Sequence, residues 1–178
     1  MPSLVDSSRT EPPSSSKMAQ NATKPASESA DDPITDLSPF EDTVDLSTFE
    51  QILEMDDDDS REFSRSIVYG YFEQAESTFS KMEEAISVPD LGELSQLGHF
   101  LKGSSATLGL TKVKDGCEKI QHFGAKKDES GTVDEPDEAK SLANIKKTLA
   151  EVKDAYNEVV VLLKRFYGDP DVRRQSSA

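Results

Sequence analysis

The sequence predicts an all-α protein, an antiparallel up-down-up-down four-helix bundle with an additional short N-terminal helix. Three observations lead to this fold class. Apolar residues recur at spacings of three and four over five stretches, the period of amphipathic helices. No proline interrupts these stretches, because Pro39, Pro89, Pro136 and Pro170 all fall outside them. The last stretch carries a long apolar seam, which several packed helices are needed to cover.

Composition divides the chain into one domain and two tails. Residues 1–40 contain many Pro, Ser, Thr and Asp residues and too few apolar ones to offset the entropy lost on ordering. We therefore expect residues 1–40 to form a disordered acidic tail, either a solvated extension or a regulatory segment. Residues 41–168 are expected to form the helical domain, and residues 169–178 a frayed C-terminal tail.

The overall charge excludes several classes of protein. The chain has 178 residues, with 35 Asp plus Glu against 20 Lys plus Arg, and a formal net charge of −15. Such a surface repels phosphates, so no nucleic-acid partner is expected. Cys117 is the single cysteine, which excludes an internal disulfide and a thiolate zinc cluster. No run approaches the roughly 20 apolar residues of a membrane span, so we expect a soluble intracellular protein without a membrane partner.

The first predicted helix is short and covers residues 46–55. Ser47 and Glu50 have the spacing of a capping box at its start. Its inward face is formed by Leu46, Phe49 and Leu53. Ile52 and Met55 fall outside that face.

Two longer helices follow. The second begins after Asp59, which can cap it with Glu62 three residues on. Its apolar stripe is formed by Val68, Tyr71, Ala75, Phe79, Met82 and Ile86. The third begins after Pro89 and Asp90 and ends near Gly109. Its inward face is formed by Leu94, Leu97, Leu101, Ser105 and Leu108.

The last two helices complete the bundle. Residues 112–123 form the fourth, antiparallel to the third because the turn between them is short, with Val113, Cys117, Ile120 and Gly124 inward. Residues 125–137 lack apolar periodicity and are expected to form an exposed loop. The fifth helix covers residues 138–167, and its seam is Leu142, Ile145, Leu149, Val152, Tyr156, Val159, Leu163 and Phe166. We expect a monomeric bundle, with a coiled-coil dimer as the alternative for this seam.

One histidine lies opposite the apolar stripe of the third helix. At about 100° per residue His99 points away from that stripe, so we expect its ring to be exposed. A neutral imidazole has a ring nitrogen free to attack phosphorus, and Lys102 at i+3 can compensate the charge of a transferred phosphoryl group. Glycine in a helix is less favourable than alanine by about 1 kcal/mol. We attribute Gly98 and Gly103 to clearance for an approaching partner.

The run at residues 99–110, His-Phe-Leu-Lys-Gly-Ser-Ser-Ala-Thr-Leu-Gly-Leu, resembles the signature of histidine-containing phosphotransfer (HPt) domains. Residues 50–60 and 117–124 resemble the fungal phosphorelay intermediates of that family. The resemblance implies that His99 is phosphorylated, that Lys102 and Gly103 belong to its site, and that Gln121 hydrogen-bonds the ring. Ala125 departs from the arginine usual in fungal members, and Lys126 is the candidate replacement.

The resemblance also implies a function. The protein would accept a phosphoryl group from the receiver domain of a hybrid histidine kinase and pass it to the receiver domain of a response regulator, in cytoplasm and nucleus. It would need no cofactor or metal of its own, with Mg²⁺ bound by the partner receiver. No nucleotide-binding loop is present, so we expect no autonomous kinase activity. The alternative is a helical adaptor that binds receivers without phosphotransfer.

Four apolar residues remain once the inward faces of the first two helices are assigned, namely Ile52, Met55, Phe63 and Ile67. They cluster around the acidic turn at residues 56–59. Such a patch is typical of an interface, although these residues could also pack on one another or under the N-terminal tail. The resemblance favours the interface, because HPt domains of this type present the corresponding positions to receiver domains.

Overall fold

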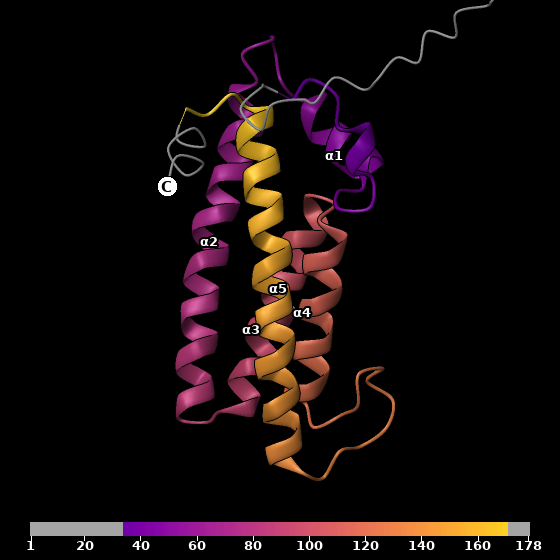
Figure 1. Cartoon of the computed structure of the whole chain (residues 1–178), viewed down its shortest axis with the longest axis vertical. Helices are drawn as coiled ribbons and strands as arrows, with labels where there is room; N and C mark the ends of the chain where they lie inside the picture. The colour runs from indigo at the N-terminus through magenta and orange to yellow at the C-terminus, as the bar shows by residue number, and fades with distance from the viewer. Residues whose placement is uncertain (1–33, 171–178) are drawn as a thin grey trace, which may run out of the picture.

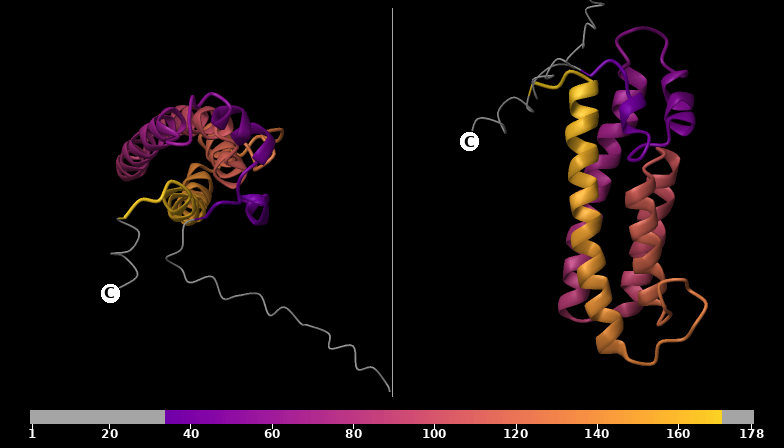
Figure 2. Two further views of the ribbon diagram at one scale, coloured as in Figure 1. Left: turned by 90° about the horizontal axis from the view of Figure 1, so that it is seen from above. Right: turned by 45° about the vertical axis from the view of Figure 1, so that its right-hand side comes forward.

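The computed structural model describes residues 34–170, and these form helices joined by loops, of which the one between residues 124 and 138 is long (Figure 1). The elements are η1 (Ser38–Phe40), α1 (Leu46–Leu53), α2 (Glu62–Ser87), α3 (Leu91–Thr107), α4 (Thr111–Gly124) and α5 (Glu138–Phe166). Helices α2 to α5 run alternately up and down as an antiparallel bundle, and α1 is a short helix at one end (Figures 1 and 2). The predicted fold class is confirmed.

Helix α1 occupies the end of the bundle where the α3–α4 hairpin stops. Helices α2 and α5 have 26 and 29 residues, against 17 and 14 for α3 and α4. At about 1.5 Å per residue, the long pair extends beyond the short pair, and α1 fills the space (Figure 1). The Asp45 amide donates to the Gly109 carbonyl at 2.7 Å. Gly109 has φ of 73°, and a Cβ there would lie 2.7 Å from the Asp45 carbonyl oxygen, so this turn requires glycine.

All five helices contribute to one apolar core. Its largest fully buried side chains include Phe49, Met82, Leu94, Leu101, Ile120, Ile145 and Leu163. Every residue of the predicted α5 seam is buried except Leu142, which is half-buried against the same core. The seam therefore packs against helices of its own chain, which leaves a coiled-coil dimer no apolar surface at that position.

The ordered region extends beyond both predicted domain boundaries. Residues 34–40 were predicted to be part of a disordered tail, but Ile34 and Leu37 are buried in the core and residues 38–40 form η1. Asp169, predicted to fray, accepts a hydrogen bond from the Tyr69 hydroxyl. The predictions for residues 1–33 and 171–178 lie outside the described residues.

The first two helices are capped by residues other than the predicted ones. Asp45, and not Ser47, caps α1 by accepting the Ser47 amide at 3.1 Å. Asp59 makes no capping hydrogen bond, because the N-cap position of α2 is Arg61, two residues later, which has no side-chain cap bond either. Asp56 reaches that helix instead, and its Oδ1 accepts the Ser64 amide at 2.8 Å.

Helices α3 and α4 agree with the prediction, and the loop after them is tied to α4. Asp90 caps α3 by accepting the Glu93 amide at 3.0 Å, and the predicted inward faces of both helices are buried. His122 lies half-buried beneath the loop, where its Nδ1 donates to the Glu129 carbonyl at 2.8 Å. None of the helices within residues 34–170 contains an apolar stretch that could span a membrane.

Candidate functional site

The site is built on a close contact between α3 and α4. A Cβ at Gly98 would lie 2.8 Å from the Cys117 carbonyl oxygen and 2.8 Å from the Gln121 amide nitrogen. The Ser95 hydroxyl donates to the Gln121 carbonyl at 2.9 Å across the same contact. Gly98 is buried, so its predicted role of clearance for a partner is wrong. It is glycine because the two helix backbones approach each other there.

His99 is exposed on the outer face of α3, as predicted, and Gln121 of α4 lies beside it. Together with Ser95 and Gln96 they line an open cavity of about 460 Å³. Among residues 34–170 no hydrogen bond joins His99 to Gln121, and Oε1 of Gln121 is buried without a partner. A buried amide oxygen without a donor is unfavourable, so a ring N–H turned toward it would be stabilised. The hydrogen bond itself stays a prediction.

Lys102 does not extend freely beside His99. Its ammonium donates to Oε1 of Glu118 on α4 at 3.4 Å, and the two side chains are 27% and 45% exposed. Glu118 was not predicted as part of the site, although the helix register indicates it. In two antiparallel helices, three residues forward on one correspond to three residues back on the other. The predicted pairing of His99 with Gln121 therefore implies a pairing of Lys102 with Glu118.

The outer face beside His99 is open on its other side. Gly103 is exposed, and an added Cβ would meet no atom within 4 Å. This agrees with the clearance expected of Gly103. Phe100 follows His99 directly and is 48% exposed, which adds an apolar surface next to the imidazole. Phe100 was also missed, and its position outside the apolar stripe was the available signal.

Only part of the predicted docking patch lies on the surface. Met55 and Phe63 are 60% and 43% exposed, and Ile67 is half-buried. Ile52 is buried, so its assignment to an exposed interface is wrong. The buried face of α1 is centred on Phe49 and Ile52, with Leu46 and Leu53 half-buried beside it. A helix of eight residues has too few turns for its apolar pattern to define one face.

Other reactive groups contribute little to this site. Cys117 is buried in the core, and burial raises the pKa of its thiol to about 12, so it is not a nucleophile near neutral pH. In the part of the chain that the structure describes, no group of three or more His, Cys, Asp or Glu side chains could hold a metal ion.

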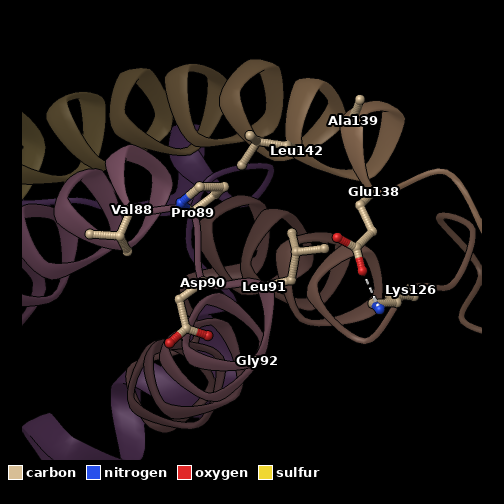
Figure 3. A pocket seen from close by; sticks show the side chains of 9 residues that line it. All are labelled: Val88, Pro89, Asp90, Leu91, Gly92, Lys126, Glu138, Ala139 and Leu142. Atoms are coloured by element: carbon tan, nitrogen blue, oxygen red, sulfur yellow. Dashed lines mark ion pairs between the residues drawn. The ribbon is translucent and has the colours of Figure 1, made fainter.

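A larger cavity of about 710 Å³ lies where the α2–α3 turn meets the start of α5 (Figure 3). Its walls include Pro89, Leu91 and Leu142, and Lys126 forms an ion pair with Glu138 at its edge (Figure 3). Lys126 thus lines this cavity and is not among the residues of the His99 cavity. Its suggested replacement of an arginine in the His99 site has no support in this arrangement.

Comparisons with known proteins agree on the nature of this bundle. Residues 67–159 match the model of the Hpt domain family. The chain is similar to Multistep phosphorelay regulator 1 of Schizosaccharomyces pombe, with 50% identity over 124 residues, 70% of this chain and 42% of the relative. It is 47% identical to Phosphorelay intermediate protein YPD1 of Saccharomyces cerevisiae over 77 residues, 43% of this chain and 46% of the relative. The chain spans less than half the length of these curated relatives.

Solved structures show the same fold. A co-crystal structure of S. cerevisiae Ypd1 with the receiver domain of its downstream response regulator Ssk1 aligns with a TM-score of 0.62 and 31% identity, covering 70% of this chain and 94% of that one. The histidine-containing phosphotransfer protein MtHPt2 of Medicago truncatula aligns with a TM-score of 0.59 and 23% identity, covering 78% of this chain and 88% of that one. The second likeness concerns the fold alone.

Proposed function

Because the chain belongs to the Hpt domain family, we propose that it is a phosphorelay intermediate that carries a phosphoryl group on His99. The donor is the phosphorylated aspartate of a receiver domain in a hybrid histidine kinase, and the acceptor is the receiver domain of a response regulator. The observation that carries this proposal is an exposed imidazole on a helix wall, with a lysine, a glycine and an amide arranged around it. The co-crystal of a relative with a receiver domain supports the class of partner.

The transfer needs no group beyond the two proteins and the Mg²⁺ of the receiver. The lone pair of Nε2 of His99 forms a bond to phosphorus as the bond from phosphorus to the aspartyl oxygen breaks. The carboxylate leaves with the bonding electrons, and Nδ1 keeps its proton. The reverse step on another receiver returns the phosphoryl group to an aspartate.

Three neighbours assist His99 in this proposal. Oε1 of Gln121 accepts a hydrogen bond from the Nδ1–H group of His99 and so turns Nε2 outward, a role that its unpartnered oxygen supports. Lys102 compensates the charge on the phosphoryl oxygens. Gly103 leaves room for the receiver, since nothing occupies the space above it.

The proposal extends to the protein as a whole. It is a stoichiometric carrier without kinase activity of its own, it holds no cofactor or metal, and it acts as a monomer. It works in the cytoplasm and the nucleus, the two compartments that the resemblance to fungal phosphorelay intermediates implies.

Incubation with an aspartyl-phosphorylated receiver domain tests this function. Transfer would place phosphate on the protein that is labile in acid and stable in base, as expected of phosphohistidine. Binding of the receiver without such phosphate would identify the protein as a helical adaptor and would contradict the proposal.

Lys102→Ala is expected to slow phosphotransfer about ten-fold and to leave receiver binding unchanged, because the ammonium acts on charge that develops at the phosphoryl group. Single-turnover transfer rates and receiver titrations measure the two effects. Lys112→Ala is the matched control, since Lys112 also joins α4 to a neighbouring helix through an ion pair, with Glu158 at 3.7 Å. An unchanged rate in Lys102→Ala would remove this residue from the mechanism.

Replacing both Met55 and Phe63 with alanine is expected to weaken receiver binding about ten-fold. Because both side chains are exposed, their removal changes the stability of the free protein little, but it removes apolar contacts from the complex. Isothermal titration with a receiver domain measures the effect. Val133→Ala is the control, since Val133 is 60% exposed on the loop at the opposite end of the bundle (Figure 1). Equal affinities for the two variants would exclude the patch from the interface.

A further inference from the structure

We propose that Glu118 sets the equilibrium of phosphoryl transfer by competing with the phosphorylated His99 for the Lys102 ammonium, an inference that rests on the proposed function. In this view Glu118 is a positioning residue that acts through Lys102. It makes the phosphohistidine less stable than Lys102 alone would make it, so that the phosphoryl group passes on readily to the next receiver.

The geometry of the resting protein places Lys102 between Glu118 and the residue that is to be phosphorylated, His99. Lys102 lies one helical turn after His99 on α3, and Glu118 faces it from α4 at 3.4 Å. Charge-assisted hydrogen bonds are usually about 2.7–2.9 Å long, so this pair is loose. Ion pairs that are this exposed contribute little to stability. The ammonium is therefore held near the site but is available to a stronger anion.

The antiparallel register makes Glu118 part of the site. Glu118 and Gln121 lie one turn apart on α4, opposite Lys102 and His99 on α3. The close approach of the helices at Gly98 fixes both pairings. The two pairs are therefore neighbours on the same face of the α3–α4 contact.

Phosphorylation changes the balance of charge at these pairings. Phosphorylation places an anionic phosphoryl group on Nε2, and its oxygens attract the Lys102 ammonium. The Lys102 ammonium must then leave Glu118 or be shared between Glu118 and the phosphoryl group. In both cases the Glu118 carboxylate stays beside a second anion, the phosphoryl group. Both effects oppose phosphorylation of His99, because neither exists while the phosphoryl group is on the receiver aspartate.

Glu118→Gln tests the inference, since glutamine keeps the shape of the side chain and removes its charge. The Ssk1 receiver of S. cerevisiae, labelled with radioactive acetyl phosphate and Mg²⁺, is the donor, and S. cerevisiae Ypd1 confirms that the receiver is competent. The plateau ratio of label on the protein to label on the receiver is expected to rise about three- to five-fold in Glu118→Gln. Glu118→Asp, which keeps the charge, is expected to stay close to the wild type.

Two further variants separate this role from a structural one. Glu158→Gln, which breaks the comparable pair of Glu158 with Lys112, is expected to leave the plateau ratio unchanged. In a Lys102→Ala background, the effect of Glu118→Gln is expected to fall below two-fold. An unchanged ratio in Glu118→Gln, or an undiminished effect without Lys102, would overturn the inference. Failure to label the wild-type protein with a receiver that labels Ypd1 would instead refute the proposed function.

Discussion

Replacing His99 with glutamine is expected to abolish phosphate uptake from a receiver domain and to leave the fold intact. The glutamine amide has no nucleophilic lone pair, so the N–P bond cannot form. The side chain at this position is exposed on the outer face of α3 and belongs to no core cluster. Acid-labile phosphate on the protein is expected to fall to background, while the free energy of unfolding stays within about 0.5 kcal/mol of the wild type.

His122→Gln is the matched control, since His122 is the other histidine of the chain. Its ring is half-buried and its Nδ1 donates to the Glu129 carbonyl, so this side chain holds the loop after α4 in place. This variant is expected to retain phosphate uptake. Uptake that persists in His99→Gln, or that is lost in His122→Gln, would show that the acceptor has been assigned to the wrong residue.

Gly98→Ala is expected to lower the free energy of unfolding by about 1–3 kcal/mol, the range of an overpacked core. The new Cβ would meet two backbone atoms of α4 at 2.8 Å, and backbone cannot turn aside as a flexible side chain can. The helices must separate, which also moves Gln121 away from His99. We therefore expect phosphotransfer to fall together with stability. Urea denaturation followed by circular dichroism measures the first effect.

Gly103→Ala serves as the control for stability, because it makes the same chemical change in the same helix. An added Cβ meets nothing within 4 Å at that position. Alanine favours a helix over glycine by about 1 kcal/mol, so this variant is expected to be more stable than the wild type. If Gly98→Ala and Gly103→Ala shifted the free energy of unfolding in the same direction, close packing of the helices would not be the reason for a glycine at position 98.

The long helices were predictable from the sequence because their apolar pattern repeats over many turns. In α3, for example, the stripe that includes Leu94 and Leu101 defines the buried face, and the exposure of His99 follows from it. The same holds for the seam of α5. Helix α1 has only eight residues, so its pattern did not determine whether Ile52 faces in or out.

Features that depend on tertiary contacts could not be predicted in the same way. The residues around Gly98 in the sequence do not show whether this glycine makes room for a binding partner or for a neighbouring helix. Asp56 caps α2 only because the acidic turn folds back on the helix. Ile34 and Leu37 are isolated apolar residues among polar ones, so no period marks them as part of the core. Glu118 becomes visible only when the register of α3 against α4 is known.

Direct identification of the phosphorylated atom tests the central claim most directly. The protein is incubated with an aspartyl-phosphorylated receiver domain, kept at alkaline pH, and examined by phosphorus NMR spectroscopy and by mass spectrometry of its peptides. We predict a single phosphoryl group, bonded to Nε2 of His99. Phosphate on His122 or on a hydroxyl side chain, or a receiver complex that forms without any phosphate on the protein, would contradict the account.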